Sequence, residues 1–182
     1  MPDTIRTNPI AGCCGLECGL CPRYHTEGSS RCPGCGGEDF TLKHPSCGFV
    51  TCCVKKHGLQ FCGQCPEFPC AKFDNETGEK DSFISHRNVL SNSGWIASEG
   101  AEEFLGELVR RQTALEKMIA GYDDGRSKSF YCIASALLSL EALESALDGM
   151  PGGDDRKALA KELRVRLEAA ASEEKAELKL RH

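Results

Sequence analysis

The fold of this chain depends on a cysteine-rich segment that begins Cys13-Cys14-Gly15-Leu16-Glu17-Cys18-Gly19-Leu20-Cys21. Cysteines three residues apart recur further along it, and the pairs are Cys18/Cys21, Cys32/Cys35 and Cys62/Cys65. Two such cysteines can bind one ion from a tight turn, because both sulfurs then reach about 2.3 Å from a common metal. The spacing therefore favours thiolate metal sites.

Disulfide bonds are the competing use for so many cysteines. Twelve of the 13 lie between Cys13 and Cys70, and only Cys132 lies beyond. Disulfides persist in oxidising compartments and as a rule close longer loops. The N-terminus has no apolar stretch typical of a secretory signal, and no run of about 18 apolar residues predicts a spanning helix. We therefore expect a cytoplasmic protein without membrane contact, in which the cysteines bind metal.

The sharpest local motif is Cys32-Pro33-Gly34-Cys35-Gly36-Gly37. Pro33 restricts φ at the start of a tight turn, and the glycines permit positive φ, so that backbone N–H groups can turn toward thiolate sulfur. This pattern is typical of a zinc knuckle. His44 and His57 flank the region, but we interpret them as a loop histidine and a helix-end histidine, not as ligands.

Eleven cysteines are the candidate metal ligands: Cys14, Cys18, Cys21, Cys32, Cys35, Cys47, Cys52, Cys53, Cys62, Cys65 and Cys70. Adjacent cysteines seldom bind one ion together, because neighbouring side chains diverge. The pair Cys52/Cys53 is therefore expected to supply one ligand, and the same reasoning applies to Cys13/Cys14.

Two four-sulfur sites follow from this count. The predicted groups are Cys18/Cys21/Cys32/Cys35 and Cys47/Cys52 or Cys53/Cys62/Cys65, with Cys14 and Cys70 as spare or exchangeable ligands. A cross-braced grouping fits the spacing equally well. Two zinc ions are the expected cofactors, and an iron–sulfur cluster stays open as the alternative because four thiolates also suit iron.

Composition divides the chain into two parts. Residues 1–73 are rich in Cys, Gly and Pro, with few large apolar side chains, so we expect a metal-binding module of knuckle turns and short helices, one of them over residues 48–57. Residues 74–82 are polar or Gly and are predicted to form a linker. Residues 83–182 are predicted to form a helical half that packs on the module, which makes the fold class mainly α.

Three apolar stripes at helical spacing support this prediction, and they run over residues 104–119, 130–138 and 140–150. A charged last helix is expected over residues 154–180. Asp123 and Asp124 precede the second stripe and are interpreted as helix-capping residues, although Arg126 and Lys128 beside them leave an anion site as an alternative. Cys132 is expected in the core, and Trp95 between the two halves.

Charge limits the choice of partner. The formal net charge is −5, and residues 1–70 carry six Lys/Arg against six Asp/Glu. Two zinc ions, each held by four thiolates, would add −4 to that balanced region. Nucleic-acid binding is therefore disfavoured, since it requires clustered basic residues.

The cysteine motifs in their order resemble a prokaryotic family called domain of unknown function 3795. The similarity rests on Cys14 to Cys21, Cys32-Pro33-Gly34-Cys35, Cys47-x4-Cys52-Cys53 and Cys62-Gly63-Gln64-Cys65-Pro66-Glu67-Phe68-Pro69-Cys70. It continues into Asp123-Asp124-Gly125-Arg126-Ser127-Lys128-Ser129-Phe130-Tyr131-Cys132, and so spans residues 10–148. The resemblance implies a cytoplasmic, zinc-binding protein, and it implies no activity.

No motif of nucleophilic catalysis, phosphate binding or dinucleotide binding is present, and no residue is singled out as catalytic. The leading hypothesis is a structural zinc protein, without enzymatic activity, that presents a surface to another protein or to a small ligand. The second hypothesis is an iron–sulfur or thiol redox protein, and the third, disfavoured, is a nucleic-acid-binding zinc module.

Overall fold

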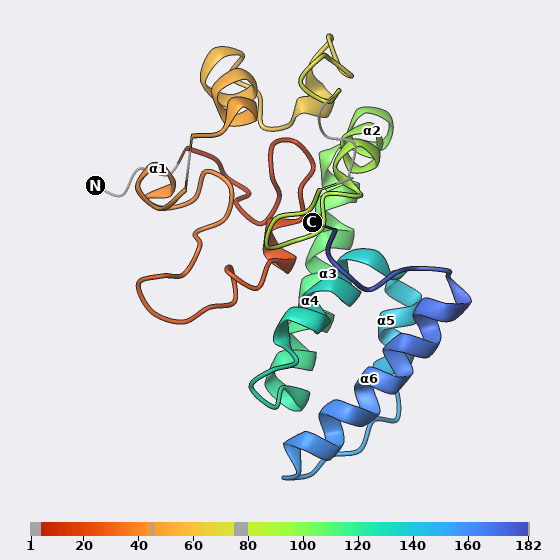
Figure 1. Ribbon diagram of the computed structural model, residues 1–182. Helices are drawn as coiled ribbons and strands as arrows, with labels where there is room; N and C mark the ends of the chain where they lie inside the picture. Colours follow the sequence, from red (N-terminus) through yellow and green to blue (C-terminus); the bar gives the residue numbers. More distant parts are fainter. Residues whose placement is uncertain (1–4, 45, 75–79, 182) are drawn as a thin grey trace.

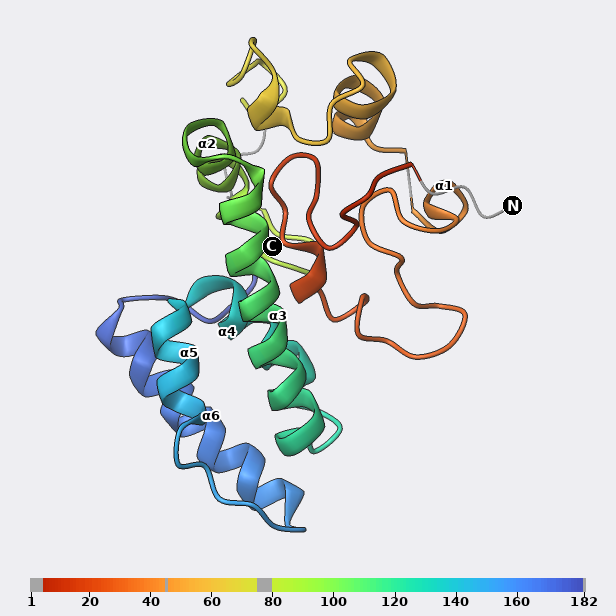
Figure 2. The same ribbon diagram turned by 180° about the vertical axis from the view of Figure 1, so that it is seen from behind.

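The computed structural model describes residues 5–44, 46–74 and 80–181, and these residues form helices and irregular segments without a strand. The cysteine-rich segment lies at one end of the molecule and the longer helices at the other (Figures 1 and 2). The mainly α fold class is thus confirmed. No helix among the described residues combines the length and the apolar character needed to cross a membrane.

The helical half is built from α3 (Ala101–Tyr122), α4 (Lys128–Leu137), α5 (Leu140–Leu147) and α6 (Arg156–Glu173). Their apolar stripes meet in one core, whose fully buried side chains include Leu108, Leu115, Tyr131, Leu143 and Leu163. The predicted stripes therefore become the inward faces of α3, α4 and α5.

Two aspartates cap the start of α4. Asp123 Oδ1 accepts hydrogen bonds from the backbone N–H groups of Ser127 (3.0 Å) and Lys128 (3.2 Å), and Asp124 Oδ1 accepts from the Ser127 hydroxyl (2.9 Å). The carboxylates thus occupy the helix N-terminus themselves, as the capping interpretation predicts.

The last helix is shorter than predicted, because α6 ends at Glu173 and the chain turns away after it. Lys175 adopts a positive φ of 55° there. The following tail is bound by Arg87, which donates hydrogen bonds to the carbonyl oxygens of Glu177 (2.7 Å) and Lys179. Both views show the C-terminus back beside the junction of the two halves (Figures 1 and 2).

The cysteine-rich segment contains only short helices, which are η1 (Cys18–Leu20), α1 (Phe40–Lys43), the π-helix η2 (Val50–Lys56) and η3 (Cys62–Gln64). The helix predicted over residues 48–57 is η2. A small second apolar cluster fills the segment, and several of its buried members are cysteines, namely Cys13, Cys35, Cys53 and Cys62 beside Phe40, Val50, Phe73 and Val89. Cysteine side chains thus occupy the positions that aliphatic residues hold in an ordinary core.

The segment packs on α2 (Val89–Glu99) through η3, and on α3 and α4 through η1. Contact with α2 is close at Gly63 of η3, where an added Cβ would lie 2.3 Å from the carbonyl oxygen of Ser93. Trp95 of α2 packs edge-on against Phe104 of α3, with ring centroids 5.9 Å apart, near this junction. Of the expected linker 74–82, residues 75–79 lie outside the described residues.

Candidate metal centre

Three buried cysteines converge inside the cysteine-rich segment. The sulfur atoms of Cys13, Cys53 and Cys62 all lie within 4.8 Å of one another. Around a tetrahedral zinc ion with bonds of about 2.3 Å, ligand sulfurs lie roughly 3.8 Å apart, so a contraction of about 1 Å brings the three into bonding range. The donor set fits zinc and also fits iron, since both metals bind thiolates. These residues can therefore hold a metal ion.

Cys35 supplies a fourth sulfur to the same cluster. Its side chain is hydrogen-bonded to that of Cys13, and all four cysteines are buried. We refer to Cys13, Cys35, Cys53 and Cys62 as the sulfur cluster. Four thiolates complete the coordination of a structural zinc ion, which has no open position for substrate.

Backbone hydrogen bonds bring these four cysteines together from separate stretches of chain. The N–H of Cys62 donates to the carbonyl oxygen of Cys13 (2.7 Å), and the N–H of Cys35 donates to that of Pro9 (2.8 Å). Gly34, in the predicted knuckle turn, has a φ of 78°, and an added Cβ would lie 2.2 Å from the Pro9 oxygen. Only glycine fits this turn without strain, so the Pro-Gly pair of the motif sets the position of Cys35.

Without metal, the cluster shares protons among its sulfurs. Hydrogen bonding to Cys35, Cys53 and Cys62, together with burial, raises the pKa of the Cys13 thiol far above its ordinary value. The hydrogen bond from Cys13 lowers the pKa of Cys35 to about 6, against the effect of burial. Hydrogen bonds from Cys13 and Cys62 lower the pKa of Cys53 to about 4. A metal ion would displace the protons that remain, so its affinity decreases as the pH falls.

A buried arginine lies beside the sulfur cluster. Arg6 is 2% exposed, and its guanidinium donates hydrogen bonds to the carbonyl oxygens of Ala11, Cys35 (3.2 Å) and Gln60 (2.7 Å). Its Nε is buried and has no partner among the described residues. Its positive charge acts to lower the pKa of Cys35 and of Cys53. Because four thiolates and one zinc ion carry a net charge of −2, Arg6 is placed to balance half of it.

The other predicted ligands lie around this cluster. Cys18 is surrounded by Cys14, Cys21, Cys32 and Cys35, and burial together with the charges of these neighbours raises the pKa of its thiol well above the ordinary value. A small cavity on the other side of Cys53 and Cys62, which also line it, is lined by Cys52, Cys65 and Cys70. Cys47 packs at the edge of the second apolar cluster.

The structure brings together Cys53 and Cys62, which belong to one predicted group, while Cys35 of the other predicted group contacts Cys13. The linear and the cross-braced groupings both stay predictions. How all eleven candidate cysteines share metal ions stays a prediction.

Sequence reasoning missed Cys13, which is the member of the sulfur cluster that contacts the other three. The rule that adjacent cysteines diverge holds here: Cys53 is buried in the cluster while Cys52 is half-buried beside the small cavity. If two metal sites lie side by side, the same rule predicts that the two members of each adjacent pair bind different ions. Applied in this way, it would have included Cys13 among the ligands. Cys132 lies in the helical core as expected, where burial raises its pKa to about 12.

The fold and the cluster define a helical protein with a buried polythiol centre that can hold metal. The model of the family described as "Protein of unknown function (DUF3795)" matches residues 10–75, and this match confirms the resemblance carried by the cysteine motifs. It includes all four members of the sulfur cluster, and it ends before the helical half. No curated protein matches the chain, and no solved structure does.

Proposed function

We propose that this is a structural zinc protein in which the sulfur cluster binds one zinc ion and thereby holds the cysteine-rich segment in its folded form. The observation that carries the proposal is the convergence of three buried sulfurs, those of Cys13, Cys53 and Cys62, with Cys35 bonded to Cys13, in a segment with little apolar core. A structural zinc site contributes about 10 kcal/mol of apparent binding free energy, which becomes folding free energy. That amount is comparable with the stability of a whole domain.

A second zinc ion is assigned to the surroundings of Cys18. The charges of Cys14, Cys21 and Cys32 all act on the Cys18 thiol, which makes these four cysteines the candidates for that ion. In this arrangement Cys13 and Cys14 serve different ions, in agreement with the divergence of adjacent side chains. With metal saturated by sulfur, the role of the protein is binding of a protein or a small ligand, in a cytoplasmic setting, and not catalysis at the metal.

Metal analysis tests this proposal directly. Protein purified without oxygen is expected to be colourless and to contain about two zinc ions per chain, because the tetrathiolate sites are closed. Cys13→Ser is expected to lose one of them, and Cys132→Ser, the matched cysteine in the helical core, is expected to retain both. Removal of zinc by a chelator should expose residues 5–74 to protease while the helical half stays resistant.

Two results would contradict the zinc assignment. A brown protein that contains iron and acid-labile sulfide would establish the iron–sulfur alternative, which the same sulfur cluster can support. An unchanged zinc content in Cys13→Ser would show that the sulfur cluster is not a metal site.

A further inference from the structure

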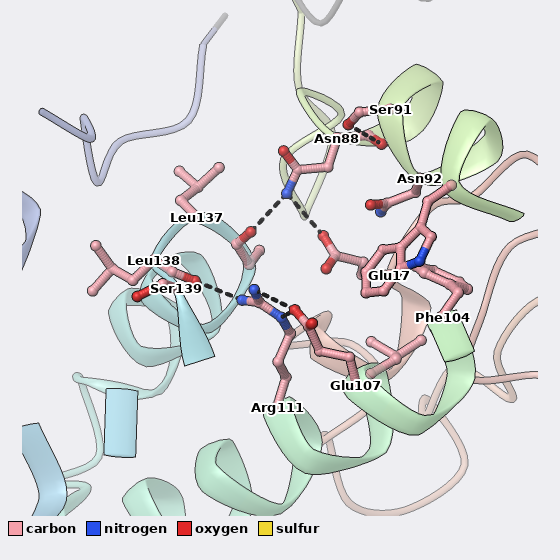
Figure 3. A pocket seen from close by; sticks show the side chains of 13 residues that line it. Glu17, Asn88, Ser91, Asn92, Phe104, Glu107, Arg111, Leu137, Leu138 and Ser139 are labelled. Carbon is pink, nitrogen blue, oxygen red and sulfur yellow. Dashed lines mark hydrogen bonds and ion pairs between the residues drawn. The ribbon is translucent and has the colours of Figure 1, made fainter. Parts of the chain in front are cut away.

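A cavity of about 270 Å³ lies between the cysteine-rich segment and the helical half, away from the sulfur cluster. Its walls come from the loop before η1, from α2, from α3 and from the turn between α4 and α5 (Figure 3). This volume suits a ligand near the lower size limit of known small-molecule pockets. The aromatic wall includes Trp95 and Phe104, and the polar wall includes Glu17, Asn88 and Arg111.

Glu17 is a buried carboxylate that faces this cavity. The residue is 5% exposed, and its Oε2 accepts a hydrogen bond from Asn88 Nδ2 at 3.3 Å. Its Oε1 has no hydrogen-bond partner in the described part of the chain, and the carboxylate points into the space between Asn88 and Arg111 (Figure 3). The protein thus buries a carboxylate without giving it a direct cationic partner.

Two donors of the polar wall, Arg111 and Asn88, are fully used by the protein. Arg111 binds Glu107 Oε1 through Nε and Nη2, both at 2.7 Å, and its Nη1 donates to the carbonyl oxygens of Ser135 and Leu138. Asn88 Nδ2 also donates to the carbonyl oxygen of Ala136 at 2.7 Å. Arg111 is therefore committed to its own neighbours and does not neutralise Glu17.

Several oxygen atoms in the cavity wall, in contrast, can still accept hydrogen bonds from a ligand. Asn92 Nδ2 donates to the carbonyl oxygen of Gly15 (2.9 Å), which leaves Asn92 Oδ1 for a ligand, and the bonds made by Asn88 Nδ2 leave Asn88 Oδ1 in the same way. Glu17 Oε1 and Glu107 Oε2 likewise accept no hydrogen bond within the described residues. The titratable groups of the wall include two carboxyl groups, Glu17 and Glu107, against the one guanidinium of Arg111.

We propose that this cavity binds a small organic ammonium ion, whose N–H groups bond to Glu17 and to the amide oxygens of Asn88 and Asn92 while its apolar body packs against Trp95. A surplus of acceptors over donors selects a ligand rich in donors. The excess of carboxyl groups over basic groups in the wall favours a cation, and an indole ring adds cation–π attraction. The inference gives a chemical class to the small ligand of the proposed function, and it does not depend on the metal.

Trp95 is the single tryptophan of the chain, so its fluorescence reports on this cavity alone. The probe is phenethylamine, which is protonated at neutral pH, and the matched control is 2-phenylethanol, a neutral molecule with the same number of non-hydrogen atoms. Both are titrated into zinc-loaded protein of measured metal content. Phenethylamine is expected to change the fluorescence saturably, with a dissociation constant at least about tenfold lower than that of the alcohol.

Two variants test the contacts. Glu17→Gln removes the charge and keeps the shape, and it is expected to weaken phenethylamine binding by at least about tenfold, whereas Glu103→Gln, on the exposed start of α3, leaves it unchanged. Ser91→Phe places a ring at the exposed rim of the cavity and is expected to block the probe, whereas Ser98→Phe on the same helix does not. Ser91→Phe decides the matter if Glu17→Gln does not fold.

Equal affinity for the amine and the alcohol would overturn the proposal, because the cavity would then be a mere apolar pocket. Absence of binding by zinc-loaded, folded protein would overturn it as well. Neither result bears on the zinc content, so failure of the ligand site and failure of the metal site are distinguishable.

Discussion

Arg6 illustrates how one buried side chain depends on the centre beside it. A guanidinium that is 2% exposed and bonded to three backbone carbonyls is costly to desolvate. Its stem packs on the ring of Phe61, with the guanidinium carbon 4.9 Å from the ring centroid. Metal binding at the sulfur cluster, as we propose it, would create a negative charge that makes this burial favourable.

Arg6→Met tests that dependence. The variant keeps an apolar stem and loses the charge and the hydrogen bonds, so the free energy of unfolding of the zinc-loaded protein is expected to fall by about 3 kcal/mol. Release of zinc to a chelator is expected to be faster. Arg23→Met, which replaces an exposed arginine stacked on Phe83, is the control and should change neither quantity measurably. Equal stability of Arg6→Met and wild type would refute the role given to Arg6.

Cysteine type and spacing predict metal binding but do not identify Cys13. A sequence pattern does not distinguish between two adjacent cysteines. The direction of the backbone alone decides which of the two side chains faces the cluster. In η2 the helical geometry turns Cys53 inward, and the carbonyl of Cys13 is held by the N–H of Cys62. Those constraints come from segments far apart in the chain, so no local pattern contains them.

The helices, unlike the positions of the cysteines, can be predicted locally, since the apolar stripes of α3, α4 and α5 indicate where these helices lie. Local periodicity predicts them because each buries one face against the others. It does not predict where α6 ends, because the charged pattern of residues 154–180 continues past Glu173. The helix ends at Glu173, and Arg87 binds the carbonyl oxygens of Glu177 and Lys179 in the tail that follows.

The contact between η3 and α2 leads to a paired glycine experiment. Gly63→Ala places a Cβ 2.3 Å from the backbone oxygen of Ser93, and neither backbone can yield easily. The free energy of unfolding is expected to fall by about 1–3 kcal/mol. Gly106→Ala, inside α3 with no atom within 4 Å of the added Cβ, is expected to raise it by about 0.5–1 kcal/mol. Urea denaturation measures both, and a neutral Gly63→Ala would argue against close docking of the segment on α2.

For the molecule as a whole, the C-terminal tail is bound to the segment before α2 through Asp81, whose side chain is buried. The Asp81 carboxylate accepts hydrogen bonds from the backbone N–H groups of His86 and Arg181, both at 2.8 Å, and lies 3.8 Å from Arg87. Burial alone would raise the pKa of Asp81, but these hydrogen bonds and the charge of Arg87 hold it below the ordinary 3.8.

This depressed pKa gives a pH dependence with a definite sign. The unfolded chain takes up the proton at higher pH than the folded one, so the stabilisation by Asp81 is complete above 3.8 and is lost as the pH falls through the folded-state pKa. Asp81→Asn is expected to reduce the free energy of unfolding by about 1–3 kcal/mol at roughly pH 7, and by less at roughly pH 3.5.

Both proteins also lose stability in acid for other reasons, including loss of metal. Subtracting the free energy of unfolding of the variant from that of wild type at each pH removes this shared effect. Asp154→Asn, an exposed aspartate before α6, should show no such difference at either pH. A gap between wild type and Asp81→Asn that stays constant with pH would mean that the Asp81 charge does not bind the tail.

The sequence alone predicts the type of the candidate ligands and the helical character of residues 83–182, because cysteine spacing and apolar periodicity are local patterns that extend over a few residues. The grouping of the sulfurs, the burial of Arg6 and the cavity around Glu17 are not. Each joins segments separated by dozens of positions, such as Glu17 with Asn88 or Cys13 with Cys62. Such contacts form only when the helical core and the sulfur-lined core pack together, since packing in three dimensions, and not distance along the chain, determines which side chains meet.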